Sequence, residues 1–189
     1  AGCRNLQFDD CVWGGLVNPK LAVALTGRRG EALEEYKKVI LALNNKVVEE
    51  APADLTINTH VCRGNYHSTF FSSGAYDGVA DLLFGEENVN AYYLEYDDER
   101  SGGFAPLAKI TGNKKVVLGL VTTKTPKLED KQSVIARIKE ASQYVPLENL
   151  YLSPQCGFAS CEIGNKLTEE EQWAKLKLVK EIAEEVWEA

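Results

Sequence analysis

Short apolar segments alternate along the chain with longer segments in which apolar residues recur at helical spacing. Each short segment is continuous and rich in aliphatic or aromatic residues, which is typical of a buried strand in a parallel sheet. Strands are therefore predicted at residues 5–8, 55–59, 91–94, 116–121 and 150–152.

The longer segments predict helices over residues 31–50, 72–84 and 128–144. A further helix is predicted over about 168–187, because Thr168 and Glu171 form a Thr-x-x-Glu capping box. An apolar stripe follows this box and comprises Trp173, Leu176, Val179, Ile182, Ala183 and Val186. Trp173 and the distant Trp13 are both expected to lie in the core.

Strands that alternate with helices predict an α/β fold with a parallel sheet. Every predicted strand is followed by polar or reactive side chains, and catalytic groups of a (β/α)8 TIM barrel gather at these carboxyl ends of the strands. We therefore expect residues 1–189 to form a single partial-barrel domain that holds the last five of eight β/α units. The side chains concerned are Asp9, Asp10, His60, Cys62, Glu95, Thr122, Thr123 and Cys156.

The chain contains no Met and opens on Ala-Gly-Cys-Arg, so we expect further residues upstream of it. An open half-barrel would expose two strand edges and an apolar face. Such a surface favours pairing with another chain, and a homodimer through the exposed barrel edges is one possibility.

The net charge of −7 and the lack of a basic stretch argue against nucleic acid as a partner. The sequence contains no apolar stretch close to the ~20 residues of a membrane span, and its first residues do not resemble a signal peptide. The five cysteines are odd in number and irregularly spaced, which favours reduced thiols and a cytoplasmic protein.

The spacing His60-x-Cys62 at a predicted strand end indicates a metal site. Side chains two residues apart on a strand point to the same side, so the imidazole and the thiolate could bind one ion together. Glu95 and Cys156 end later strands and are the candidates for two further ligands. Two sulfurs, one nitrogen and one oxygen suit zinc. The alternative is a metal-free domain in which the His and Cys residues are simply buried.

Four segments resemble the cobalamin-independent methionine synthase family, and in particular its short, single-barrel members. The resemblance runs along essentially the whole chain, and the segments are residues 58–69, 93–102, 119–126 and 152–160. It implies that His60, Cys62, Glu95 and Cys156 are zinc ligands. It also implies a methyltransferase that moves a methyl group from a methyl-folate to the sulfur of homocysteine. Cys3, Cys11 and Cys161 match no ligand position and are expected to be packing or incidental thiols.

The implied chemistry is reasonable, because an alkyl thiol has a pKa of about 8–9 and zinc would deprotonate it. A carboxylate is the ligand most easily displaced by an incoming thiol, so Glu95 is expected to take part in catalysis as well as in metal binding. The resemblance implies that Asp9, next to Asp10, holds the substrate amino group, whereas the plainer interpretation is a pair of helix-entry acids. Arg63, Asn65 and His67 either contact substrate or order their loop.

The chain departs from the family at one segment. Full methionine synthases carry a His-Ser-Pro-Arg-like segment where this sequence has Thr122-Thr123-Lys124. Because that histidine is implied in protonation of the departing folate, the departure leaves two alternatives open. One is a zinc-dependent alkyl transferase acting on another thiol such as coenzyme M, and the other is a non-catalytic zinc-binding fragment that oligomerises.

Overall fold

The computed structural model describes residues 2–188 and contains a five-stranded parallel sheet. The strands lie side by side in chain order, as they do in a TIM-type barrel. The predicted α/β fold of this type is thereby confirmed, with five strands, of which the third is followed by 3-10 helices in place of an α-helix. The strands are β1 (Asn5–Asp9), β2 (Thr56–Val61), β3 (Ala91–Glu95), β4 (Lys115–Val121) and β5 (Leu150–Pro154).

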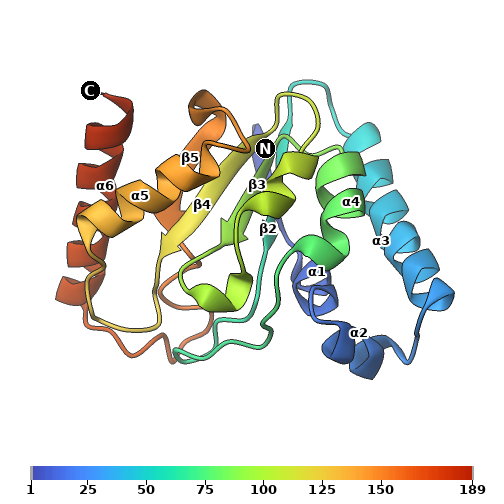
Figure 1. Ribbon diagram of the computed structural model, residues 1–189, viewed down its shortest axis with the longest axis horizontal. Helices are drawn as coiled ribbons and strands as arrows, with labels where there is room; N and C mark the ends of the chain where they lie inside the picture. The colour runs from blue at the N-terminus through green and yellow to red at the C-terminus, as the bar shows by residue number, and fades with distance from the viewer. Residues whose placement is uncertain (1, 189) are drawn as a thin grey trace.

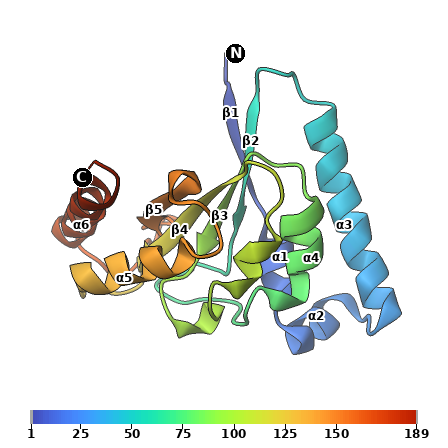
Figure 2. The same cartoon turned by 45° about the horizontal axis from the view of Figure 1, so that its top comes forward.

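The helices are arranged along one side of the sheet (Figures 1 and 2). None of those within residues 2–188 has the length and apolar character needed to cross a membrane. The α-helices are α1 (Cys11–Leu16), α2 (Pro19–Thr26), α3 (Glu31–Glu49), α4 (Asp77–Glu86), α5 (Lys131–Ala141) and α6 (Glu169–Trp187). Short 3-10 helices are η1 (Glu99–Ser101), η2 (Ala105–Lys109) and η3 (Leu147–Asn149).

The main core lies between the sheet and these helices. It includes Tyr92 and Leu118 of the sheet, Leu83 of α4 and Ile138 of α5, all fully buried. Burial of one such side chain contributes about 1.5–3 kcal/mol. The opposite face of the sheet carries both apolar and polar side chains. A cavity of about 400 Å³ on it is lined by Asn5, Thr56, Asn58, Ala91, Tyr93, Lys115, Val117, Tyr151, Leu152 and Ser153.

Local hydrogen bonds account for the differences between predicted and observed helices. The helix predicted at 72–84 begins only at Asp77, because the backbone N–H of Ser72 bonds to the carbonyl of Arg63, outside the helix. The helix predicted at 128–144 begins later because Asp130 caps it, accepting the N–H of Ser133. The short helices α1 and α2 are absent from the prediction, although Asp10 and Asn18 cap them in the same way.

Helix α6 forms with its predicted capping box, but its buried face differs from the predicted stripe. Trp173 is 59% exposed, so its assignment to the core is wrong, whereas Trp13 is fully buried as expected. The helix buries Leu178 and Ile182, and Lys175 is buried on the same face with its ammonium 3.1 Å from Glu129. The ion pair offsets the cost of burying the charge.

Helix α1 packs directly on the segment that follows β2. A Cβ atom added at Gly14 would overlap the backbone carbonyl of Cys62, so only glycine permits this approach. Since Cys62 is a candidate metal ligand, the packing of α1 helps to set its position.

We predict that Gly14→Ala lowers the free energy of unfolding by about 1–3 kcal/mol, the usual cost of overpacking. The sign of this change in the free energy of unfolding separates the two effects, because alanine normally stabilises a helix relative to glycine. Urea unfolding would measure it. Gly103→Ala is the matched control, since a Cβ there meets no atom within 4 Å, and equal effects of both substitutions would contradict the prediction.

A buried carboxyl group lies beneath the same helix. Burial raises the pKa of Glu87 to about 7, despite the hydrogen bond that Asn44 donates to it at 2.8 Å. Between pH 4.5, the ordinary pKa of this side chain, and pH 7, the folded protein retains a proton that the unfolded chain releases. The free energy of unfolding therefore decreases as the pH rises through this window.

Glu87→Gln should remove this pH dependence and make the variant more stable than the parent above pH 7. The difference between parent and variant should change by about 2 kcal/mol from pH ~5 to pH ~8. Urea unfolding at the two pH values gives the measurement. The exposed neighbour Glu86 provides the control Glu86→Gln, and a parallel pH profile for parent and Glu87→Gln would refute the prediction.

Candidate metal centre

The carboxyl ends of the strands bring four potential ligands together. His60 lies on β2 and Cys62 directly follows it, Glu95 ends β3, and Cys156 lies two residues beyond β5. One ligand atom from each of the four lies within 4.8 Å of the others. His60, Cys62 and Glu95 are buried and Cys156 is partly buried. The residues that the sequence singles out are thus neighbours in space.

The imidazole of His60 is oriented for a ligand. Its Nδ1 lies 3.1 Å from the carboxylate of Asp9, which accepts the Nδ1–H. Its Nε2 is buried, has no hydrogen-bond partner and lies 3.7 Å from Glu95. A carboxylate on one ring nitrogen and a free, inward-facing second nitrogen are the usual arrangement of a metal-binding histidine. The donor set therefore fits a zinc ion.

Glu95 is fully buried and compensated from several segments. It accepts the N–H of Arg63 at 2.7 Å and the guanidinium of Arg100 at 3.0 Å, and the Gln155 amide lies 3.5 Å away. Although burial alone would raise the pKa of Glu95, the nearby imidazole of His60 and the hydrogen bond from the Arg63 N–H lower it. The carboxylate is therefore ionised and available as an oxygen ligand.

The two candidate thiols are in contact and differ in acidity. A hydrogen bond from Cys156 lowers the pKa of Cys62 to about 7, against the effect of burial. The same hydrogen bond, together with burial, raises the pKa of Cys156 above its usual range. Although burial alone would lower it, the hydrogen bond to Asp9 and the nearby carboxylate of Glu95, 3.7 Å from Nε2, raise the pKa of His60 to about 9. The acidified thiol of Cys62 thus lies close to the imidazole of His60.

The other predicted site residues differ in their exposure and in their hydrogen-bond partners. The Asp9 side chain is 66% exposed. Asp10 accepts the N–H groups of Val12 and Trp13 as the cap of α1. Arg63 is fully buried with its guanidinium over the Tyr76 ring.

Two further predicted residues follow Arg63 along the chain. Asn65 is buried and bonded to protein atoms, and the Nδ1 of His67 lies 3.1 Å from the carbonyl of Gly164. These contacts agree with the alternative in which Arg63, Asn65 and His67 order their loop, and Asp10 acts as a helix-entry acid.

Sequence reasoning missed several residues at this site. Cys11, at the start of α1, offers a sulfur within 4.8 Å of Asp9 and Cys62. Gln155 precedes Cys156 and is buried. The one signal in the sequence is that these residues directly follow a strand end or flank a ligand, which is too general to select them.

Comparison with known proteins identifies the family. The profile of the cobalamin-independent synthase catalytic domain matches residues 1–185. The Bacillus subtilis protein YxjG, itself uncharacterized, is 47% identical over 98% of this chain and 49% of its own length. The chain belongs to the cobalamin-independent synthase catalytic-domain family.

More distant members carry a functional name. The methionine synthase of Pyrococcus horikoshii is 29% identical over 54% of this chain and 27% of its own length. The chain spans about half the length of the curated relatives that match it along its whole length.

Solved structures agree with the fold. A Listeria monocytogenes chain assigned as a vitamin-B12 independent methionine synthase has 42% identity and a TM-score of 0.71, and the match covers 98% of this chain and 49% of that one. A B12-independent methionine synthase from Shewanella, in complex with selenomethionine, has the same TM-score at 20% identity over the same shares and shows the fold alone.

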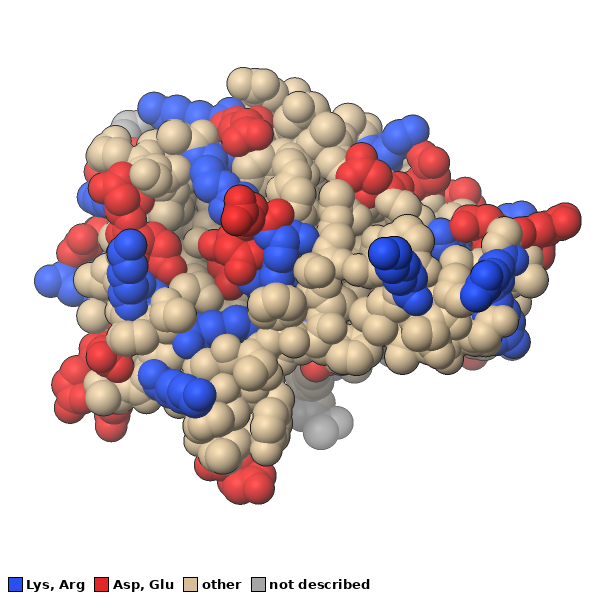
Figure 3. Space-filling model, turned by 60° about the horizontal axis from the view of Figure 1, so that its bottom comes forward, with Lys and Arg blue, Asp and Glu red and all other residues tan. Residues whose placement is uncertain are grey.

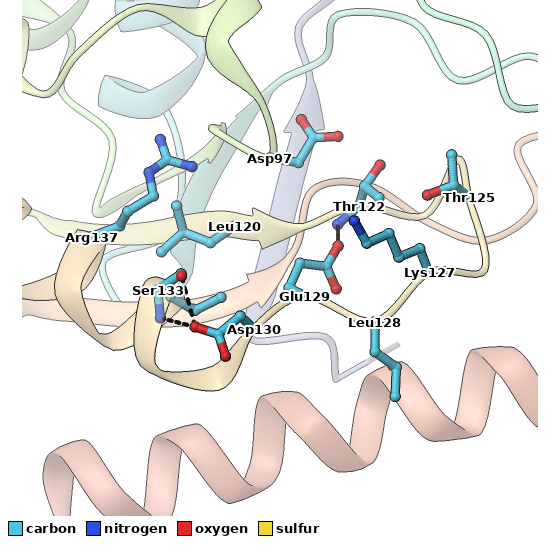
Figure 4. Close-up of a pocket in the computed structure, with 11 residues that line it drawn as sticks. Asp97, Leu120, Thr122, Thr125, Lys127, Leu128, Glu129, Asp130, Ser133 and Arg137 are labelled. Carbon is cyan, nitrogen blue, oxygen red and sulfur yellow. Dashed lines mark hydrogen bonds between the residues drawn. The ribbon is translucent and has the colours of Figure 1, made fainter.

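A small cavity adjoins the cluster that this synthase-family chain assembles. It has about 260 Å³ and is lined by Gln7, His60, Tyr93, Leu94, Ser153, Pro154, Gln155, Cys156 and Gly157. A larger hollow of about 490 Å³ lies elsewhere, between β4 and the start of α5 (Figure 4). There Glu129 and Asp130 already accept backbone N–H groups. The smaller cavity is therefore the better candidate for substrate.

The surface around the strand ends carries charges of both signs. In the view that brings the bottom of Figure 1 forward, acidic and basic side chains are interspersed (Figure 3). Beneath this surface Arg100 is 6% exposed and joins three carboxylates, those of Glu95, Asp97 and Asp98. This ion-pair group supports the candidate ligand Glu95 from the side away from His60.

We predict that Arg100→Ala lowers the free energy of unfolding by about 3–5 kcal/mol, because Glu95 and Asp97 would remain buried without their cation. Denaturant unfolding provides the measurement. The matched control is Lys109→Ala, which removes an exposed pair with Asp81 and should leave stability nearly unchanged. A similar small effect of both substitutions would count against the role of Arg100.

Proposed function

We propose that this protein is a zinc-dependent methyltransferase that acts on homocysteine, with a methyl-tetrahydrofolate-type compound as the donor. The observation that carries the proposal is the convergence of His60, Cys62, Glu95 and Cys156, with the Nε2 of His60 buried and unpartnered. Membership of the synthase family supports the reaction class. The names of relatives support homocysteine as the acceptor, since they are methionine synthases.

Two sulfurs, one nitrogen and one oxygen form a donor set that zinc accepts. When bound, zinc would supply the acidity that keeps the substrate thiol deprotonated at neutral pH. The remaining tasks fall to the protein. Asp9 holds the His60 ring through Nδ1, and Arg100 forms an ion pair with the buried carboxylate of Glu95.

Asp9 also suits the recognition of the substrate. Its Oδ1 lies against His60, while its side chain as a whole is 66% exposed. The exposed part of the carboxylate can accept a hydrogen bond from an ammonium group of an amino acid. We therefore propose that Asp9 orients homocysteine beside the metal ligands, and that Arg63, Asn65 and Asp10 order the surrounding loops.

The rest of the reaction involves more than these residues. Because the chain spans about half the length of its curated relatives, we propose that residues 1–189 supply one half of a barrel-type active site. The edges of β1 and β5 are the places where further strands, or a second copy of the chain, would pair.

The first test is metal content. We expect about one zinc per chain in protein purified without added metal, and its loss in Cys62→Ser and in Cys156→Ser. Cys161→Ser is the matched control, because Cys161 lies outside both cysteine-containing ligand groups of the described residues. Retention of stoichiometric zinc by both ligand variants would exclude the proposed site.

The second part of the test is transfer. Protein loaded with zinc is incubated with a methyl-tetrahydrofolate donor and either homocysteine or coenzyme M, and the methylated thiol is quantified. Methionine formation that Cys62→Ser abolishes is expected. Methylation of coenzyme M alone would identify coenzyme M as the acceptor. In protein that contains the complete barrel, zinc binding without transfer to either thiol would contradict the proposed reaction.

A further inference from the structure

The segment that carries Cys156 has no regular structure of its own. It runs from the end of β5 at Pro154 to the start of α6 at Glu169 without a helix or strand. Within the described residues β5 pairs only with β4, so the sheet holds this segment from one side. Other contacts must therefore hold Cys156 toward Cys62.

Asn65 supplies such contacts. Its amide nitrogen donates to the carbonyl of Gly157 at 2.7 Å and to the hydroxyl of Ser160 at 3.0 Å. Its carbonyl oxygen accepts from the ammonium of Lys124 at 3.1 Å and from the amide of Asn165 at 2.9 Å. An asparagine side chain offers two N–H donors and an oxygen with two lone pairs, so these four bonds use its full capacity.

The same contacts join three loops. Asn65 follows β2, Lys124 follows β4, and Gly157, Ser160 and Asn165 follow β5. Asn165 strengthens the junction, because its amide donates to the carbonyl of Thr123 at 2.8 Å and its oxygen accepts the N–H of Ser68 at 2.9 Å.

Residues on both sides of Cys156 are held in this way. Before it, Gln155 accepts the N–H and the hydroxyl of Thr123 at 2.9 and 2.6 Å. After it, Gly157 is held by Asn65. Asn65 is 5% exposed and Gln155 is 2% exposed, so water competes little for these bonds.

We propose that Asn65 is a positioning residue that fixes the Cys156 segment against the His60–Cys62 segment and thereby sets the affinity of the metal site. The inference rests on the proposed zinc binding. It assigns Asn65 no contact with substrate, since its hydrogen-bonding capacity is filled by protein atoms. Partners of metal ligands commonly change metal affinity by 10–100-fold when they are removed, and a loss of about this size is expected here.

The test compares Asn65→Ala and Asn65→Asp with the parent protein. The aspartate keeps the shape and the oxygen that accepts from Lys124 and Asn165. It removes the donors to Gly157 and Ser160 and adds a negative charge beside Lys124. Asn149→Ala is the matched control, since that asparagine makes a side-chain bond to Asn113 on the surface. Zinc affinity is measured by competition with a chromogenic chelator, and we expect both Asn65 variants to bind about 10–100-fold more weakly while the control is unchanged.

Cobalt substitution provides a readout that a general loss of stability would not produce. Thiolate-to-cobalt absorption reports how many thiolates are bound, so the spectra of the Asn65 variants should shift toward that of Cys156→Ser. If Asn65→Ala folds poorly, the zinc affinity and the cobalt spectrum of Asn65→Asp provide the test. A parent that binds zinc, with Asn65→Asp retaining its affinity and its cobalt spectrum, would overturn the role of Asn65 and leave the proposed function intact. A parent that binds no zinc would refute both.

Discussion

Glu95 ends a central strand at a place that water does not reach, and a carboxylate in such a place must be compensated by the protein. Its partners come from different parts of the chain: the Arg63 N–H from the segment after β2, the Arg100 guanidinium from η1, and the Gln155 amide from the segment after β5. To satisfy one buried charge, these segments must converge on the end of β3. The same convergence brings His60, Cys62 and Cys156 to within ligand distance of Glu95.

Two of the four candidate ligands are positioned by the sheet and two by the loops that follow its strands. His60 and Glu95 belong to paired strands, so the strand register determines their separation. The cysteines lie outside the strands, and their positions depend on packing and hydrogen bonds. Cys62 lies against α1 through the close approach at Gly14, and the segment of Cys156 is bonded to Asn65. The strands therefore fix the positions of His60 and Glu95, whereas packing and hydrogen bonds to neighbouring residues fix the positions of Cys62 and Cys156.

Much of this architecture could be predicted because the signals were local. The strands appear as short apolar runs, and parallel strands in chain order place their carboxyl ends together. The capping box of α6 depends on two residues three apart. The candidate metal ligands could not be chosen from a local pattern alone, since a His-x-Cys pair by itself is ambiguous. The resemblance to the synthase family supplied the pairing of His60 and Cys62 with Glu95 and Cys156.

The sequence by itself determined the five-stranded parallel order and the residue types at the strand ends, because hydrophobic periodicity and strand alternation act over a few residues. Only the tertiary structure decided that Lys175 is buried in place of Trp173, that Cys11 lies beside Cys62, and that Asn65 bonds to protein on all sides. Each of these depends on a partner tens of residues away, such as Glu129 for Lys175 or Gly157 for Asn65. Buried polar groups are compensated by ion pairs and hydrogen bonds with distant segments of the chain. A local sequence pattern therefore does not predict which partner each group has.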